Sequence, residues 1–320
     1  MKRILVLLGL SILLGDAVAG PLLERLRERR EAREPATAEW GEEADAVSAG
    51  GLPTGMRVLR DLAYGTDAKQ RLDVYLPPKV AQGLGKLPVI FMVHGGAWRV
   101  GDKAMSRVVD NKLARWSPRG VVFVSVNYRM LPGADPREQA EDVARALGFA
   151  QNKAADWGAD PAGFVLMGHS AGAHLVSLLN SAPQRAFALG ARPWLGTVSL
   201  DSAAMDVPAI MQTRHYRFYD KAFGTDPAFW QETSPLQQLS SGAPPLFAVC
   251  SSQRPDKPCP ATQRYAEAAR RLGGRVEVLE QAASHSALNE DLGKPGAYTE
   301  AVEHFMASLS PALAAHLNGN

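Results

Sequence analysis

The stretch from Phe164 to Leu179 constrains the fold most, because its pattern changes from that of a strand to that of a helix within a few residues. Residues 164–167 are continuously apolar, and apolar residues recur at helical spacing after Ser170. The segment between them, 168–172, reads Gly-His-Ser-Ala-Gly and fits the pattern Gly-x-Ser-x-Gly. This spacing places a serine hydroxyl on a sharp strand-to-helix turn, where flanking glycines let the strand and the helix approach closely. We therefore predict that Ser170 is a nucleophile; the alternative is a structural glycine-rich turn.

The rest of the chain alternates strand and helix patterns around this turn. Apolar runs and alternation predict strands over 56–62, 71–76, 87–93, 121–126, 164–167, 196–200, 244–250 and 275–279. Helical spacing predicts helices after Ser170 and over 105–116, 136–157, 261–272 and 297–309. Such alternation implies an α/β fold, with a mostly parallel, doubly wound sheet and helices on both faces. We expect one large catalytic domain over 52–316, since a chain of 320 residues that is 46% hydrophobic can bury a large core.

An irregular segment, 206–242, lies between two of the predicted strands. It carries a dense group of aromatic residues, namely Tyr216, Phe218, Tyr219, Phe223, Phe229 and Trp230. This density suggests a small cap over the site. The alternative is that these side chains fill the core beneath a long loop.

The first residues predict export. A charged start (Met1-Lys2-Arg3) precedes an apolar run over 4–15 and the motif Ala17-Val18-Ala19, so we predict a removable signal peptide over 1–19 and a periplasmic or secreted protein. An uncleaved membrane anchor is the alternative, but the apolar run is shorter than the ~20 residues that a spanning helix needs. Residues 20–51 are rich in Arg, Glu and Ala without a wide apolar face, and we expect a flexible charged extension there.

Charge and cysteine content narrow the possible partners. The formal net charge is +2, and Lys and Arg do not concentrate around aromatic residues, so nucleic acid is not an expected partner. We also expect no stable membrane insertion once the signal peptide is removed. The chain has only two cysteines, Cys250 and Cys259, and in an exported chain these are expected to form a disulfide.

A serine hydroxyl needs a histidine to accept its proton and an acid to orient that histidine. His285 follows the last predicted strand, in the chain order Ser, acid, His, and is our candidate base. Asp256 is the only carboxylate between the strand that ends at Cys250 and the next helix, and is our candidate acid. Asp201, just after the preceding strand, is the alternative. His174 lies on the helix after the serine, and we expect it to pack against the sheet.

The oxyanion formed in acyl transfer needs backbone N–H donors. His94-Gly95-Gly96 ends a predicted strand and forms an exposed turn that can direct such donors inward. We predict that Gly96 and Ala97, or Gly95 and Gly96, act together with the N–H of Ala171.

Taken together, these motifs resemble those of α/β-hydrolase serine esterases with a His-Gly-Gly-x-Trp oxyanion motif. That group includes hormone-sensitive-lipase-like and feruloyl-esterase-like bacterial carboxylesterases and kynurenine formamidases. The matching pieces are His94-Gly95-Gly96-Ala97-Trp98, Gly101-Asp102-Lys103, Asn127-Tyr128-Arg129, Asp160-Pro161, Gly168-His169-Ser170-Ala171-Gly172, and His285 with Asn289 and Gly293. The stretch from Cys250 to Cys259 is most similar to exported enzymes of the feruloyl-esterase-like type.

The resemblance implies a serine carboxylic-ester hydrolase that needs no metal and no cofactor. It also implies that Trp98, His169 and Tyr128 bind the substrate, a small or polysaccharide-linked ester whose identity is set by the cap and pocket. Two alternatives remain: an amidase or formamidase of the same fold, and a non-catalytic binding protein that keeps the fold.

Overall fold

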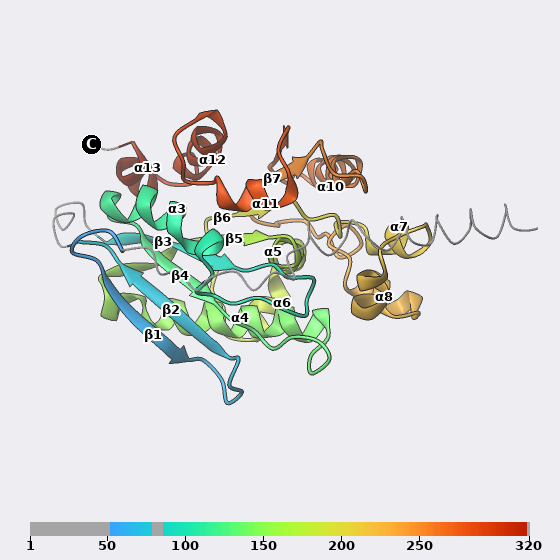
Figure 1. Cartoon of the computed structure of the whole chain (residues 1–320), viewed down its shortest axis with the longest axis horizontal. Helices are drawn as coiled ribbons and strands as arrows, with labels where there is room; N and C mark the ends of the chain where they lie inside the picture. The colour runs from blue at the N-terminus through green and yellow to red at the C-terminus, as the bar shows by residue number, and fades with distance from the viewer. Residues whose placement is uncertain (1–51, 79–85, 319–320) are drawn as a thin grey trace, which may run out of the picture.

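The computed structural model describes residues 52–78 and 86–318. These residues form one eight-stranded sheet with the strand order β1-β2-β4-β3-β5-β6-β7-β8 (Figure 1). The strands are β1 (Arg57–Ala63), β2 (Arg71–Leu76), β3 (Leu87–Val93), β4 (Val122–Val126), β5 (Ala159–His169), β6 (Gly196–Leu200), β7 (Leu246–Ser251) and β8 (Val276–Gln281). β2 is antiparallel to β1 and β4, and the other neighbouring pairs are parallel. The prediction of a mostly parallel sheet is confirmed.

Helices cover both faces of the sheet (Figure 1). On one face lie α4 (Pro136–Lys153), α5 (Ala171–Ser181) and α6 (Pro183–Ala188). On the other face lie α3 (Ser106–Trp116), α11 (His285–Glu290), α12 (Ala297–Ala307) and α13 (Pro311–Leu317). Successive side chains of the central strand β3 point to opposite faces: Val89, Phe91 and Val93 join the first core cluster, and Ile90 and Met92 join the second. Burial on both faces explains why this strand is continuously apolar in sequence.

Two elements that position site residues differ from the sequence-based expectation. β5 begins at Ala159 and not at Phe164, because the residues around Asp160-Pro161 continue the extended backbone of the strand. His285 begins the helix α11, which the sequence analysis treated as a loop. This helix has six residues, too few for a helical apolar period, and the Ser284 side chain caps it by accepting a hydrogen bond from the N–H of Ala287.

The segment between β6 and β7 carries three short helices, α7 (Val207–Met211), α8 (Arg217–Phe223) and α9 (Pro227–Glu232). Tyr219 and Phe223 are buried and join the core cluster, while Phe218 and Tyr219 also line a pocket that contains Ser170. The segment is therefore both a cap at the site and a part of the core. We refer to residues 207–234 as the cap.

The two ends of the cap meet. The N–H of Leu236 donates to the carbonyl oxygen of Met205 at 2.9 Å, and the N–H of Val207 donates to Ser234 Oγ at 3.2 Å. The chain therefore leaves the sheet and returns to it at one place. After the cap, α10 (Pro258–Arg271) packs on β7 and β8.

The expected signal peptide (1–19) and charged extension (20–51) lie outside the described residues. Within the described ranges, no helix combines the length and the apolar character needed to cross a membrane.

Candidate active site

Ser170 occupies the turn between β5 and α5, as the motif predicts. Its backbone has φ 56° and ψ −119°, a left-handed conformation that is uncommon for a residue with a side chain. A Cβ on Gly168 would lie 2.4 Å from the carbonyl oxygen of Gly172, and one on Gly172 would lie 2.2 Å from that of Val93. Only glycine fits at these two positions, so the Gly-x-Ser-x-Gly spacing follows from close packing of α5 on the sheet.

The carboxylate that contacts His285 is that of Asp201. His285 Nδ1 lies 2.6 Å from Asp201 Oδ2, and both side chains are almost completely buried. Asp201 directly follows β6 and has a left-handed backbone, with φ 58°. The N–H of Ser251, at the end of the neighbouring strand β7, donates to Asp201 Oδ1 at 2.8 Å. The carboxylate is thereby held from the adjacent strand while it faces the imidazole.

Asp256, our candidate acid, is engaged elsewhere, and the geometry corrects that expectation. Its two carboxylate oxygens accept hydrogen bonds from Arg254 Nε at 2.9 Å and Nη2 at 2.5 Å. Arg254 is buried, and its Nη1 also donates to the carbonyl oxygen and Oδ2 of Asp201, each at 3.0 Å. The same Nη1 lies 3.2 Å from His285 Nδ1. Arg254 therefore stands between the two carboxylates, and the alternative acid, Asp201, takes the position beside the imidazole.

Burial and charge shift the pKa values of this group in directions that keep Asp201 ionised and His285 neutral. Burial alone would raise the pKa of Asp201, but the hydrogen bond from His285 and the charge of Arg254 lower it to about 2. Burial lowers the pKa of His285, the hydrogen bond to Asp201 raises it, and Arg254 lowers it, with a net shift below the usual value. A neutral imidazole beside an ionised carboxylate is the resting state of a general base.

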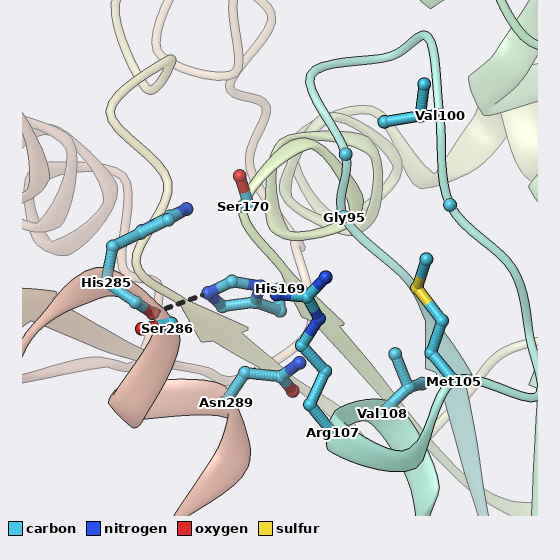
Figure 2. Close-up of a pocket in the computed structure, with 12 residues that line it drawn as sticks. Gly95, Val100, Met105, Arg107, Val108, His169, Ser170, His285, Ser286 and Asn289 are labelled. Atoms are coloured by element: carbon cyan, nitrogen blue, oxygen red, sulfur yellow. Dashed lines mark hydrogen bonds between the residues drawn. The ribbon is translucent and has the colours of Figure 1, made fainter. Parts of the chain in front are cut away.

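His169, the residue before the serine, contacts His285 through a hydrogen bond to its backbone. Its Nε2 lies 2.9 Å from the carbonyl oxygen of His285, and the two rings lie 4.5 Å apart at their centres. Figure 2 shows this hydrogen bond and the ring of His285 extending on the side where the hydroxyl of Ser170 lies. Burial holds the pKa of His169 well below its usual value, so a neutral ring donates this bond.

The loop after β3 packs against the serine turn. A Cβ on Gly95 would lie 2.8 Å from Ser170 Cβ, so the backbone of the loop passes directly beside the nucleophile. Gly96, Ala97 and Trp98 have successive φ angles of 119°, 50° and 60°, a tight left-handed turn. The N–H of Ala171 starts α5 and has no acceptor within its own helix. Gly95, Gly96 and Ala97 line pockets that also contain Ser170, so the loop lies where the predicted oxyanion site would be.

Buried side chains hold this loop from behind. Gln139 Nε2 donates to the carbonyl oxygen of Trp98 at 2.9 Å. Trp98 Nε1 donates to His174 Nδ1 at 3.2 Å, and His174 Nε2 donates to the carbonyl oxygen of Thr233 at 2.7 Å. We expect from the sequence only that His174 packs against the sheet. The structure shows in addition that His174 links the loop, the serine helix and the cap. Burial lowers its pKa to about 4, which preserves the neutral form that this chain of bonds requires.

Tyr128 does not line the site, so the expectation that it binds the substrate is wrong. It is fully buried, its ring stacks on His94 at 4.6 Å, and its hydroxyl donates to the carbonyl oxygen of His94 at 2.9 Å. The side chain therefore supports the start of the loop instead of contacting substrate.

Two pockets meet at Ser170. The first, of about 40 Å³, is lined by His169, His285 and Asn289 among others. The second, of about 10 Å³, is lined by Trp98 and by Phe218 and Tyr219 of the cap among others. Trp98 and His169, expected to bind substrate, thus lie where a substrate would bind. Among the described residues, no group of three His, Cys, Asp or Glu side chains is arranged to hold a metal ion.

Arg254 and the bridging position of His174 are two features of the site that were not predicted from the sequence. Arg254 carries a signal in hindsight, since a basic residue two positions from Asp256 offers that carboxylate a local partner. His174 carries none, because its partners are a tryptophan and a backbone carbonyl that are distant in the chain.

A mostly parallel sheet of this strand order, with a serine turn after β5 and a histidine after β8, defines the α/β-hydrolase fold. Solved structures show the same fold. Esterase B from Lactobacillus rhamnosis superposes with a TM-score of 0.65 at 18% identity, covering 93% of this chain and 95% of that one. Thermogutta terrifontis esterase 2 gives 0.64 at 21% identity, with 82% and 97% covered.

Sequence comparison agrees. Residues 72–189 match the family model BD-FAE. Esterase LipQ of Mycobacterium tuberculosis is 28% identical over 248 residues, which are 72% of this chain and 57% of that protein. The probable isoprenylcysteine alpha-carbonyl methylesterase ICMEL1 of Oryza sativa subsp. japonica is 34% identical over 121 residues, or 38% and 27% of the two chains. The matched region thus spans little more than half of LipQ and about a quarter of ICMEL1.

A disulfide joins Cys250, near the end of β7, to Cys259, in the first turn of α10, with the Cα atoms 5.2 Å apart. The loop that it closes contains Arg254 and Asp256. The bridge therefore bounds the segment that places the guanidinium beside Asp201.

Proposed function

We propose that this protein is an exported serine hydrolase of carboxylic esters. The observation that carries the proposal is the set formed by Ser170 on its turn and His285 held at 2.6 Å by Asp201, within one pocket region. Relatives named esterase or methylesterase, and structural neighbours named esterase, support the same chemistry.

The reaction begins when Ser170 Oγ attacks the ester carbonyl carbon while His285 accepts the hydroxyl proton. Asp201 keeps the imidazole in the tautomer that has Nε2 free to accept, and stabilises the imidazolium that forms. The carbonyl oxygen becomes an oxyanion, which the backbone N–H of Ala171 and those of Gly96 and Ala97 stabilise.

Collapse of this intermediate breaks the bond to the alcohol, which leaves with the proton from His285. Water then attacks the acyl-serine, gives its proton to His285, and the acid is released as the proton returns to Ser170. Arg254 acts by position: it fixes the Asp201 carboxylate and opposes protonation of His285.

The substrate is a small ester, or an ester group on a larger molecule such as a polysaccharide. The pocket beside His285 holds about 40 Å³, which suits a short group near the reacting carbon. Asn289 lines this pocket, and within the described structure its buried Oδ1 has no hydrogen-bond partner, so it offers an acceptor to a bound hydroxyl or amide.

Export is supported by the leader pattern at 1–19 and by the disulfide, since disulfides persist in oxidising compartments. Fractionation of expressing cells, with N-terminal sequencing of the product, tests this part. An intact Met1 terminus in the cytosolic fraction would contradict it.

The decisive experiment measures hydrolysis of 4-nitrophenyl esters of rising acyl length by the purified protein and by Ser170→Ala. We expect activity on short esters and its loss by about 10⁶-fold in the variant, as for other nucleophile knockouts. An amide of the same acyl group, run in parallel, separates an esterase from an amidase. A folded Ser170→Ala protein with undiminished activity would disprove the assignment.

A further inference from the structure

A larger cavity, of about 680 Å³, lies between the cap and the loop closed by the disulfide. Its walls come from α7, the start of α8, and the segment from Pro255 to Arg264. The residues that carry charge or can titrate along these walls are Asp206, Arg214, His215, Asp256, Lys257 and Arg264, besides two tyrosines. The described mechanism uses none of this space.

The cavity is adjacent to the nucleophile. Ala203 and Tyr219 line both the cavity and the pocket that contains Ser170. Ala203 directly follows the Asp201-Ser202 turn, and its side chain is a single methyl group. The far end of an ester bound at Ser170 can therefore extend past Ala203 and Tyr219 into the cavity.

Both carboxylates that line the cavity form ion pairs, and Asp256 shares its partner Arg254 with Asp201. Asp256 is paired with Arg254, and Asp206 Oδ2 lies 3.6 Å from Arg264 Nη2. His215 Nε2 lies 3.0 Å from Asp220 Oδ1, a carboxylate on α8 that does not line the cavity.

Arg214, on the cap, and Lys257, on the loop, both line the cavity, and both are exposed. Within the described part of the chain, neither forms an ion pair. Arg214, Lys257 and Arg264 are three cations in the lining, against the two carboxylates Asp206 and Asp256, so the lining carries an excess of one positive charge.

We propose that this cavity binds the anionic end of an extended ester substrate, with Arg214 and Lys257 as the groups that recognise it. The proposal rests on the proposed esterase function and adds a substrate class to it: esters whose acyl or alcohol part ends in a carboxylate or a similar anion. Arg214 supplies a guanidinium from the cap, and Lys257 supplies an ammonium from the loop. Both groups bind carboxylates in proteins.

The test compares matched esters that differ only in a terminal charge. On the acyl side, the 4-nitrophenyl monoester of adipic acid is compared with 4-nitrophenyl hexanoate. On the alcohol side, the butyrate ester of 6-hydroxyhexanoate is compared with hexyl butyrate by proton release. We expect kcat/KM to favour the anionic member in at least one pair, and this preference to fall as salt rises, because salt screens exposed charges.

The double variant Arg214→Gln, Lys257→Gln tests whether these two residues cause the preference for the anionic ester. Each exposed charge should be worth about two- to fivefold in kcat/KM, so the ratio of anionic to neutral ester should fall by about tenfold in the double variant. Lys153→Gln, which removes an exposed lysine paired with Asp156 on the surface, is the matched control and should leave the ratio unchanged. Equal melting temperatures establish that the variants are folded.

The outcomes separate the two proposals. If no ester of either kind is hydrolysed in a Ser170-dependent way, the proposed function fails. If neutral esters are hydrolysed but neither anionic ester is preferred, or the double variant keeps the wild-type ratio, only the anion-binding inference is wrong. A preference for a cationic ester, such as butyrylcholine over 3,3-dimethylbutyl butyrate, also overturns it.

Discussion

His285 Nδ1 and Asp201 Oδ2 lie 2.6 Å apart although 84 positions separate the two residues in the chain. The contact joins the end of β6 to the start of α11, across the end of β7. It predicts that Asp201→Asn lowers kcat by about 10⁴-fold, since an amide at this place leaves the imidazole in the wrong tautomer. Asp256→Asn should lower kcat by less than about tenfold, because Asp256 acts only through Arg254. Steady-state kinetics of both variants identifies the acid. A larger loss of kcat in Asp256→Asn than in Asp201→Asn would show that Asp256 is the acid.

Arg254 should control the pH profile. Burial and the charge of Arg254 lower the pKa of His285, so the neutral base persists below pH 6.5 and the acidic limb of kcat/KM should lie below that value. Removing the charge in Arg254→Met should raise the pKa of His285 and move the limb to higher pH. Arg254→Lys keeps a cation and should leave the limb closer to that of the wild type. A limb that is identical in all three proteins would show that Arg254 has only a structural role.

Lowering the pH should destabilise the folded protein already above the pH range in which carboxylates are protonated, because of two buried histidines. Burial lowers the pKa values of His94 and His174 to about 4, whereas both side chains titrate near 6.5 when unfolded. Between these values only the unfolded chain binds the extra protons, so the free energy of unfolding falls as pH drops from 6.5 to 4. The slope is about 1.4 kcal/mol per pH unit for each such histidine.

Urea unfolding at a series of pH values measures this slope. His174→Gln, which keeps hydrogen-bonding groups but cannot titrate, should reduce the slope by one histidine's share. An unchanged slope would mean that His174 is not kept neutral by the fold.

The disulfide should stabilise the chain and hold Arg254 in place. Closing a loop of this size is worth about 2.7 kcal/mol in the chain-entropy model. The Cys250→Ala, Cys259→Ala variant should therefore melt about 5–10 °C lower. Its acidic limb should shift toward higher pH, in the direction of Arg254→Met, because the loop holds the guanidinium less firmly.

Mass spectrometry of the non-reduced protein checks the bridge directly, since alkylation of two free thiols is inconsistent with it. A lower melting temperature with an unshifted pH limb would separate the two parts of this prediction: the bridge would stabilise the fold without positioning Arg254.

The sequence predicts the strands well because a buried parallel strand must be apolar on both faces, as β3 is. It also predicts the serine turn, since Gly168 and Gly172 leave no room for any other residue. The short α11 lacks a helical period and is missed for that reason.

The acid is harder to predict, because β6 and β7 are parallel neighbours and both Asp201 and Asp256 follow at the same edge of the sheet. Which of the two faces His285 depends on backbone conformation and on Arg254. The left-handed φ of Asp201 turns its carboxylate toward the imidazole, and the guanidinium occupies Asp256. The backbone conformation of Asp201 cannot be predicted from spacing or composition, and the two-residue spacing of Arg254 and Asp256 indicates only that this pair can form.

The meeting of the cap's two ends has an evolutionary consequence. Because the N–H of Leu236 donates to the carbonyl oxygen of Met205, the segment that leaves β6 and the segment that returns to β7 are joined at the base of the cap. The length of the intervening segment can therefore change while the chain still returns to the sheet at this place, provided that Tyr219 and Phe223 keep their positions in the core. New substrate preferences can then arise by exchange of one contiguous segment, provided that a backbone carbonyl remains where Thr233 now accepts from His174.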